Sequence, residues 1–372
     1  MIPNGLLCHP AVFAVEDEYQ ILMLSEKPVL LSVLVNGKEY FDDACGVRRS
    51  DTETHRITVP QAALDAAGCY TLRVCEVIER KPYWPNIAEP QDYAYTFRAL
   101  TKTEDIVLYH IADVHGRAQH AIAAAKAAAK QPDVLLFNGD IPDHCGDFVQ
   151  MHALLNIASA VSGGTLPCVC ARGNHDFRGC YAEHYIDYLP TRHGLTYYTF
   201  RVGCLWGVVL DCGEDKHDDR EEYNGTICCH SFREKQTEFL RNVSGYDHPD
   251  VKYRLVLCHN PFTQTPVPPF DIDVPILTEW ATILKETVKP QLMICGHTHT
   301  FEVREEGCAR DHKGQPCPIV IASNPKEIGY TGPEYNGYTG AAITLNGNVA
   351  EVVCNDNTGA QGFTATVPLK QW

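Results

Sequence analysis

The sequence has no uninterrupted run of about 18 apolar residues, the length that a membrane-spanning helix needs. Its first twenty residues, MIPNGLLCHPAVFAVEDEYQ, also lack a basic stretch followed by an apolar core, so they do not resemble a secretory leader. These absences lead us to expect a cytoplasmic protein with no membrane partner. A mature chain that had already lost a leader would give the same pattern.

Positive charge is also scarce. The chain has 31 Lys and Arg residues against 47 Asp and Glu residues, a formal charge of −16. An acidic surface repels phosphate backbones, which argues against nucleic acid as a partner and makes a nuclease a disfavoured interpretation. Bound divalent cations would make the charge positive locally.

The 17 cysteines include no CxxC pair of the kind that binds structural zinc. Several stand inside apolar runs, where Cys behaves as a small hydrophobic residue. An odd number of scattered thiols suits a reducing compartment better than an oxidising one.

Residues 1–101 consist of short alternating runs separated by turn residues, which predicts strands. The clearest runs are residues 29–35, 55–59, 70–75 and 93–97, and Asn36-Gly37 is a hairpin turn signal. We expect a small all-β sandwich of the immunoglobulin or fibronectin type with a structural or docking role.

Residues 102–372 alternate between apolar strands and helical segments. Strands are predicted at 105–111, 134–137 and 167–170, with helices at 117–130 and 148–160 between them. A strand–helix–strand order builds a parallel sheet whose ligand sites lie at the carboxyl ends of the strands. The rest of this region predicts a hairpin at 195–210, a solvated acidic loop at 214–222, a helix opened by a capping box at 231–234, and several later strands. The whole chain is therefore predicted to have an α/β (α+β) fold with mixed sheets and helices outside.

Polar residues that can bind metal follow five of these strands. The motifs are Asp113-Val114-His115, Gly139-Asp140-Ile141-Pro142-Asp143, Gly173-Asn174-His175-Asp176, a single His259, and Gly296-His297-Thr298-His299. Each motif alone is more simply explained by a loop Asp or a hydrogen-bonded core His than by a metal ligand. Five such groups at one sheet edge favour a shared metal site, since carboxylate and imidazole both bind divalent ions. The glycines would let the backbone turn closely beneath the ligands.

This ordered series of motifs resembles the calcineurin-like metallophosphoesterase superfamily over residues 105–300. The resemblance implies a four-layer α/β/β/α sandwich with a two-metal centre, here preceded by the small all-β sandwich. It implies one metal held by Asp113, His115, Asp140 and His299, and a second held by Asp140, Asn174, His259 and His297. It also implies that His175 contacts the scissile phosphate and that Asp176 orients the imidazole of His175.

The chemistry of such a site is phosphate ester hydrolysis. Two cations about 3.5–4 Å apart neutralise the phosphate oxygens and activate a water molecule. Mixed nitrogen and oxygen ligands suit two divalent ions such as Mn, Fe or Zn. We therefore expect a hydrolase that acts on a small-molecule phosphate mono- or diester, with His175 as an acid or phosphate-stabilising group. The alternative is a non-catalytic metal-binding scaffold or interaction protein of the same fold. The sequence does not specify an oligomeric state.

At three positions the chain differs from known branches of the family, which narrows the choice of branch. Purple acid phosphatases have a Tyr where Asp143 stands and lack a His at the position of His115. Ser/Thr protein phosphatases have an Arg where His144 stands. The run from Gly173 to Arg178 is similar to the Gly-Asn-His-Asp-x-Arg form of cyclic-nucleotide phosphodiesterase-like members. Arg178 is thus either a bidentate phosphate ligand or a surface residue of the loop.

The loops around the predicted site are candidates for substrate recognition, or else simply pack against the core. They contain Phe177, Tyr181 and Tyr185, the acidic loop, Asn324-Pro325-Lys326, and the segment from Tyr330 to Tyr338. Arg172 and His110, next to the motifs, are predicted to hydrogen-bond the ligands.

Overall fold

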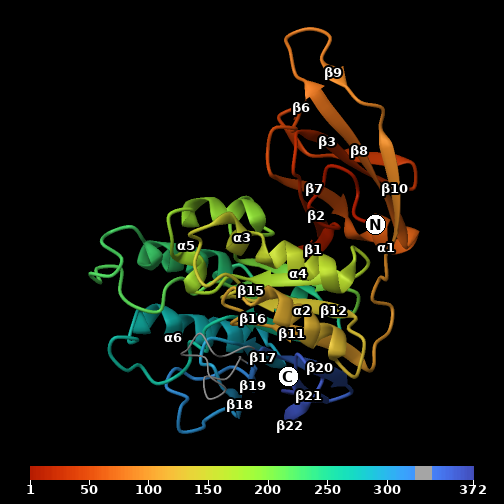
Figure 1. Cartoon of the computed structure of the whole chain (residues 1–372). Coiled ribbons are helices and arrows are strands. Elements are labelled where there is room, and N and C mark those ends of the chain that lie inside the picture. The colour runs from red at the N-terminus through yellow and green to blue at the C-terminus, as the bar shows by residue number, and fades with distance from the viewer. Residues whose placement is uncertain (323–336) are drawn as a thin grey trace.

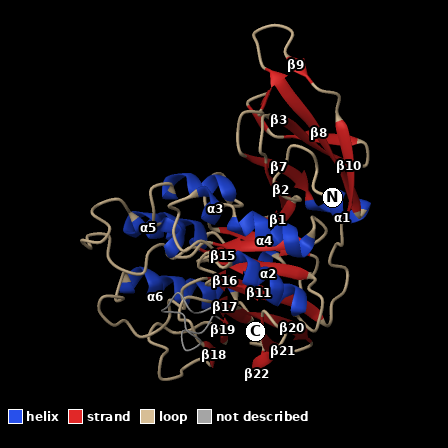
Figure 2. Ribbon diagram, viewed as in Figure 1, coloured by secondary structure: helices blue, strands red, loops and turns tan. Residues whose placement is uncertain are grey.

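Two large β-sheets lie face to face and helices cover their outer sides (Figures 1 and 2). The computed structural model describes residues 1–322 and 337–372. In this part of the chain, no helix is long and apolar enough to cross a membrane.

The first sheet has nine strands in the order β22-β21-β20-β11-β12-β13-β1-β2-β7. Its three central strands are buried along their whole length and pair in parallel, as their continuous apolar sequences predict. The strands are β22 (Gln361–Pro368), β21 (Val349–Asp356), β20 (Thr339–Asn346), β11 (Ile106–Ile111), β12 (Val134–Asn138), β13 (Pro167–Ala171), β1 (Ala11–Val15), β2 (Glu18–Leu24) and β7 (Thr54–Pro60).

The second sheet has six strands in the order β14-β15-β16-β17-β19-β18. Strands β15, β16, β17 and β19 run parallel, and β14 and β18 close the two edges in antiparallel pairing. The strands are β14 (Tyr198–Val202), β15 (Leu205–Leu210), β16 (Tyr253–Cys258), β17 (Leu292–Cys295), β19 (Ile319–Ala322) and β18 (Phe301–Arg304).

Side-chain alternation along the strands divides the interior into layers. Leu108 and Leu136 point into the core between the two sheets, where they join Leu255 and Ile294. Their neighbours Tyr109 and Phe137 point to the opposite face, which is covered by α2 (Ala118–Ala127) and α4 (Ala153–Ser162). The outer face of the second sheet is covered by α5 (Cys229–Arg241) and α6 (Val274–Ile283). The predicted α/β/β/α sandwich is confirmed.

The N-terminal β-rich part adds a five-stranded sheet in the order β10-β8-β3-β4, with β9 paired to β8. Figure 1 shows this part rising above the rest of the molecule. Its elements are β3 (Val29–Val35), β4 (Lys38–Phe41), β8 (Cys69–Glu79), β9 (Asn86–Ile87), β10 (Gln91–Thr96), the short pair β5 (Asp43–Ala44) and β6 (Val47–Arg48), and helix α1 (Gln61–Ala67).

The first sheet crosses the predicted boundary between residues 101 and 102. Strand β1 pairs in parallel with β13, so that Phe13 lies opposite Cys168, and β2 and β7 extend the sheet beyond β1. One layer of the expected sandwich is therefore continuous with the sheet of residues 102–372, and β1 and β2 are not among the predicted strands. The division into two domains at this point stays a prediction.

Two helices differ from their predictions. Helix α5 begins at Cys229, so Ser231 lies inside it and its hydroxyl donates to the Cys228 carbonyl; the predicted capping box is wrong. The helix predicted at 148–160 is divided into α3 (Phe148–Met151) and α4, and the Asp147 side chain caps the first piece by accepting from the Gln150 amide.

Candidate metal centre

The carboxyl ends of the parallel strands in both sheets meet at one edge of the molecule. Strands β11, β12 and β13 of the first sheet end there, and so do β16 and β17 of the second. The structure brings together all seven predicted metal ligands, which follow these five strands directly: Asp113, His115, Asp140, Asn174, His259, His297 and His299.

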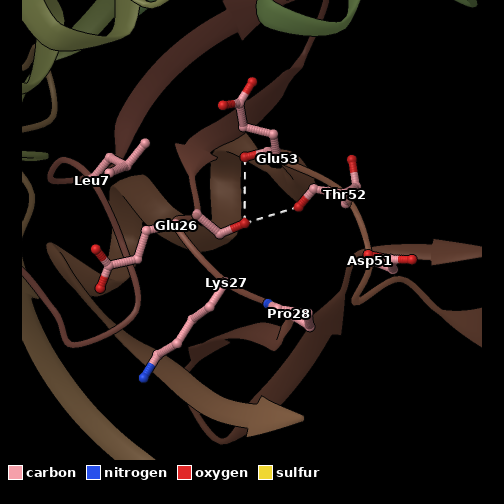
Figure 3. Close-up of a pocket in the computed structure, with 8 residues that line it drawn as sticks. Leu7, Glu26, Lys27, Pro28, Asp51, Thr52 and Glu53 are labelled. Atoms are coloured by element: carbon pink, nitrogen blue, oxygen red, sulfur yellow. Dashed lines mark hydrogen bonds between the residues drawn. The ribbon is translucent and has the colours of Figure 1, made fainter. Parts of the chain in front are cut away.

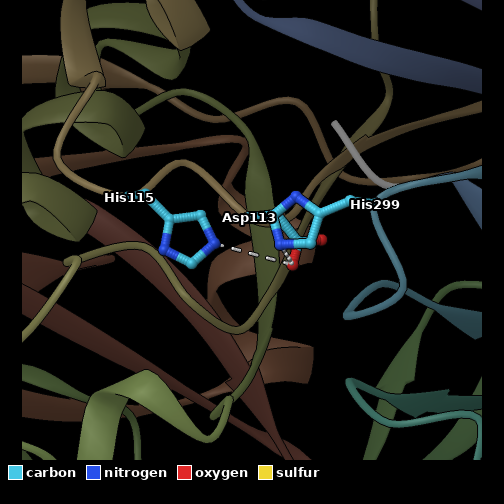
Figure 4. A group of neighbouring side chains, drawn as sticks. All are labelled: Asp113, His115 and His299. Carbon is cyan, nitrogen blue, oxygen red and sulfur yellow. Dashed lines mark ion pairs between the residues drawn. The ribbon is translucent and has the colours of Figure 1, made fainter. Parts of the chain in front are cut away.

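Asp113, His115 and His299 form the first donor group, shown in Figure 4. The Oδ1 atom of Asp113 lies 3.6 Å from His299 Nε2 and 3.9 Å from His115 Nε2. His115 Nε2 also lies 3.9 Å from Oδ2 of Asp140. Ligands bound at about 2.0–2.2 Å to one divalent ion stand about 3–4 Å apart, and this group meets that requirement.

Asp140, His259, His297 and Asn174 form the second donor group. His259 Nε2 lies 3.1 Å from Asp140 Oδ2, and His297 Nδ1 lies 2.9 Å from Asn174 Oδ1. The His259 ring donates from Nδ1 to the Asn138 carbonyl at 2.6 Å, so its Nε2 atom is the one that faces the carboxylates. A backbone carbonyl at the far ring nitrogen is the usual way in which a metal-binding His is oriented. The donor set fits a divalent ion, and Asp140 is shared between the two groups.

Five of the seven predicted ligands have a left-handed backbone. Their φ values are 54° at Asp113, 46° at His115, 53° at Asp140, 70° at His297 and 53° at His299. This conformation is uncommon for residues other than Gly and is concentrated at functional sites, where the surrounding structure maintains it.

Two motif glycines are explained by crowding beneath the ligands. A Cβ atom on Gly139 would stand 2.6 Å from both His259 Nδ1 and the Gly173 backbone. A Cβ atom on Gly296 would stand 2.7 Å from Asp113 Oδ2. Any larger residue at either position would displace a ligand.

Two buried carboxylates govern the electrostatics of the site. Burial alone raises the pKa values of Asp113 and Asp140, but the surrounding imidazoles, His259 first, bring both below the ordinary value. Burial alone would lower the pKa of His259, but the carboxylates of Asp140 and Asp113 raise it to about 10. The pKa of His297 falls to about 4 through burial and the neighbouring His259. The carboxylates therefore require positive charge beside them, which His259 or a metal ion can supply.

The environment of His175 differs from the expectation that Asp176 orients its ring. His175 donates from Nδ1 to the backbone carbonyl of Asp143 at 2.8 Å, and its Nε2 atom accepts from Arg178 at 3.0 Å. The buried Asp176 carboxylate instead accepts from the Gly173 amide at 2.8 Å. Burial and the nearby Asp140 raise the pKa of Asp176 well above its ordinary value. Asp176 therefore holds the turn of the motif, while Asp143 and Arg178 orient the His175 imidazole.

Asp143 also contacts a predicted metal ligand through its side chain. Its Oδ1 atom accepts from His115 Nδ1 at 3.1 Å, and this hydrogen bond is the main cause that lowers the pKa of Asp143. Asp143, His115 and His175 are close enough to form a third group of possible donors. The sequence motif places Asp143 among residues that can bind metal, but its contacts with His115 and His175 were not predicted.

The first two residues of the predicted solvated loop after β15 are the main correction at the site, whereas residues 219–222 are exposed as predicted. Glu214 is fully buried, and both its carboxylate oxygens accept from Arg178, at 2.6 Å and 2.8 Å. Asp215 is also buried and lies 3.8 Å from His297 Nε2. Asp211, at the end of the same strand, accepts from Arg172 at 2.8 Å. The signal was available in the sequence, because an apolar run that ends in Asp211 repeats the pattern of the other strands.

Most aromatic residues near the motifs pack against the core. The ring of Phe177 lies 3.6 Å from the Arg172 guanidinium, and Tyr185 is buried. The hydroxyl of Tyr338 donates to the Ala112 carbonyl at 2.8 Å. His110 contacts the Asn138 side chain at 3.0 Å, and the carbonyl of the same Asn138 accepts from His259. The candidate segment 324–326 and residues 330–336 of the segment from Tyr330 to Tyr338 lie outside the described residues.

A cleft of about 430 Å³ opens beside the donor groups. Besides ligands, it is lined by His175, Arg178, Asp215, Lys216, Gln264, Phe270 and Thr298. The cleft is large enough for a small phosphate ester.

A larger hollow of about 550 Å³ lies in the N-terminal part (Figure 3). The Ser25 hydroxyl donates to the Thr52 and Glu53 carbonyls across it, and Lys27 pairs with Glu76 at 2.5 Å. Glu53 lies 3.0 Å from His152 in the helical layer. Only the last of these contacts joins the N-terminal strands to the rest of the molecule, and no predicted ligand lines the hollow.

Comparisons with known proteins agree with this architecture. The family model described as calcineurin-like phosphoesterase matches residues 106–301, and the chain belongs to this family. No curated protein matches the sequence significantly.

Two solved structures share the fold along almost the whole chain. The purple acid phosphatase PPD1 from yellow lupin (Lupinus luteus) seeds has 12% identity and a TM-score of 0.63, over 96% of this chain and 74% of that one. PhoD has 11% identity and a TM-score of 0.55, over 99% of this chain and 90% of that one. At these identities the likeness concerns the fold alone.

Proposed function

We propose that this chain is a metal-dependent hydrolase of small-molecule phosphate mono- or diesters, with two divalent ions at the strand edge. The observation that carries the proposal is the meeting of seven predicted ligands in two donor groups that share Asp140. Asp113, His115, Asp140 and His299 would hold one ion. Asp140, Asn174, His259 and His297 would hold the other, with Mn, Fe and Zn as candidates.

The ions, when bound, neutralise the oxygens of a phosphate ester and acidify a water molecule for attack on phosphorus. His175 and Arg178 stand beside the shared carboxylate, because the His175 amide donates to Asp140 Oδ1 at 2.8 Å. With its proton on Nδ1 and its Nε2 atom bound to Arg178, His175 fixes the guanidinium at the cleft. Arg178 then offers positive charge to the phosphate oxygens as negative charge develops on the leaving oxygen.

The substrate class follows from size and charge. The cleft of about 430 Å³ suits a small ester. The formal charge of −16 disfavours a polyanion such as nucleic acid as substrate.

A turnover assay with metal-free protein tests this proposal. Mn, Fe or Zn would be added back, and hydrolysis of p-nitrophenyl phosphate and bis(p-nitrophenyl) phosphate measured for wild type and Asp140→Asn. Activity that depends on metal and is lost in Asp140→Asn supports the proposal. Equal rates for the two proteins would overturn the mechanism. No metal by elemental analysis, together with no turnover, would favour the non-catalytic scaffold.

A cytoplasmic location stays a prediction. Its support is that all 17 cysteines have free thiols in the structure, which suits a reducing compartment.

A further inference from the structure

A second cavity shares a wall with the metal cleft. Its volume is about 500 Å³, and it lies among the loops that follow β13 and β15. Of the described residues, Arg178 alone lines both this cavity and the cleft beside the donor groups. Arg178 therefore stands at the boundary between the two hollows.

The shared wall is polar and rigidly held. Arg178 is anchored by two hydrogen bonds to the buried Glu214 carboxylate. Lys216, which lines the cleft, pairs at 2.9 Å with Glu222, which lines the cavity. A guanidinium and an ion pair, rather than apolar core, separate the two hollows. A phosphate group fits at such a boundary, because its oxygens can accept from the guanidinium.

The lining of the cavity combines carbon surface with carboxylates and thus differs from that of the cleft. Phe177, Ala182, Tyr223 and Ile227 provide carbon surface, and the Tyr223 hydroxyl is already bonded to Glu214 at 2.9 Å. Two carboxylates, Glu183 and Glu222, also line the cavity. The positive charge of Arg178 is balanced by Glu214. The cavity therefore disfavours a second anionic group and suits an uncharged or cationic organic group.

We propose that this cavity binds the second alcohol group of a phosphodiester, an uncharged or cationic organic group, while the phosphate occupies the metal cleft. The proposal rests on the proposed function and adds a preference for diesters. A monoester has one organic group, whereas a diester carries two and can fill both hollows. In the reaction, the water oxygen bonds to phosphorus, the bond to the leaving oxygen breaks, and that oxygen takes up the proton released by water. The group in the cavity stays esterified in the monoester product.

Three p-nitrophenyl esters with the same leaving group test the proposal. They are p-nitrophenyl phosphate, bis(p-nitrophenyl) phosphate and p-nitrophenyl phosphorylcholine, assayed with the full chain after metal is restored. Ala182→Trp, at the start of the 3-10 helix η2 (Ala182–Tyr188), and Ile227→Trp, in the loop after β15, each place an indole in the cavity, and the exposed Ala129→Trp is the matched control. The readout is the ratio of kcat/KM for each diester to kcat/KM for the monoester. Thermal unfolding checks that each variant folds, and two positions protect the test against one misfolded variant.

We expect this ratio to fall by about tenfold in both filled variants, equivalent to about 1.4 kcal/mol of transition-state binding, and to stay unchanged in Ala129→Trp. Glu183→Lys should lower kcat/KM for the phosphorylcholine ester more than for bis(p-nitrophenyl) phosphate. An unchanged ratio in both filled variants would overturn the subsite, and equal effects of Glu183→Lys on the two diesters would overturn its charge preference. Absence of turnover of all three esters by wild type would instead remove the proposed function itself.

Discussion

Arg178 donates a hydrogen bond from Nη1 to Nε2 of His175 at 3.0 Å, while its Nε and Nη2 atoms are held by Glu214. The cation beside His175 is thus fixed by a buried carboxylate from the other sheet, since Glu214 follows β15. This relationship makes Glu214 a positioning residue for a group that faces the cleft.

Glu214→Gln should lower kcat/KM on p-nitrophenyl phosphate by about 10–100-fold, the usual cost of losing a partner that orients a site residue. The amide removes the charge that balances Arg178 and offers one acceptor oxygen in place of two. Metal content, measured by elemental analysis, should stay the same because Glu214 does not contact the donor groups directly. The matched control is Glu221→Gln, at an exposed position in the same loop. Similar losses in the two variants, or loss of metal in Glu214→Gln, would contradict this role.

Asp143→Ala should weaken metal binding by about 10–100-fold, because His115 loses the acceptor that fixes its ring. Asp143→Asn keeps an acceptor oxygen at this position and should restore most of the affinity. Titration against a competing chelator measures the change, with the exposed Asp219→Ala as control. Since the hydrogen bond from His115 lowers the pKa of Asp143, its carboxylate stays charged throughout the neutral range, and the effect should not vary between pH 6 and pH 8. Equal affinity for wild type and Asp143→Ala would show that the contact does not matter for binding.

Metal binding should release protons at pH 8. In the metal-free protein, the carboxylates of Asp140 and Asp113 raise the pKa of His259 to about 10 against the opposing effect of burial, so the ring is protonated. An imidazole must be neutral to bind a metal, and its proton is therefore displaced. Calorimetric titration in two buffers of different ionisation enthalpy measures the release, and apparent affinity should rise as the pH approaches about 10.

The same shift fixes how the stability of the metal-free protein depends on pH. Because the folded pKa lies above the ordinary value of 6.5, the ion pair contributes fully below that pH and its contribution is lost as the pH rises toward about 10. Saturation with metal should remove this dependence. Metal binding without any proton release would show that His259 is neutral in the free protein.

The sequence was sufficient to predict the residues of the donor groups. It was insufficient to predict the contacts of the residues that support the site, such as Glu214 and Asp176. Ligands such as Asp113 and His259 follow apolar strands directly, and parallel strands bring their carboxyl ends to one edge, so local pattern determines their position. Glu214 looked like part of a solvated charge run, because its burial depends on a partner 36 residues away. The family resemblance implied that Asp176 orients the His175 ring. The tight turn instead directs the Asp176 carboxylate to the Gly173 amide.

Strand β1 shows the same limit in the fold. Its five residues are a continuous apolar run near the N-terminus, and nothing in the sequence indicates that their partner is β13, more than 150 residues later. Such pairing is decided by the open edge of the sheet, which forms only when the strands of residues 102–372 come together.

A fragment that begins at residue 102 should therefore fail to fold cooperatively. It would lack β1, β2 and β7 and leave β13 as an unpaired edge in an apolar setting. Phe13→Ala in the full chain is the milder test: this buried ring packs on Phe137 with centroids 6.3 Å apart, and its loss should lower the free energy of unfolding by about 3–5 kcal/mol. Urea denaturation followed by circular dichroism measures both, and the exposed Tyr83→Ala serves as a control expected to change stability by less than about 0.5 kcal/mol. A fragment that unfolds with the same cooperativity and stability as the full chain would show that residues 102–372 are an independent domain after all.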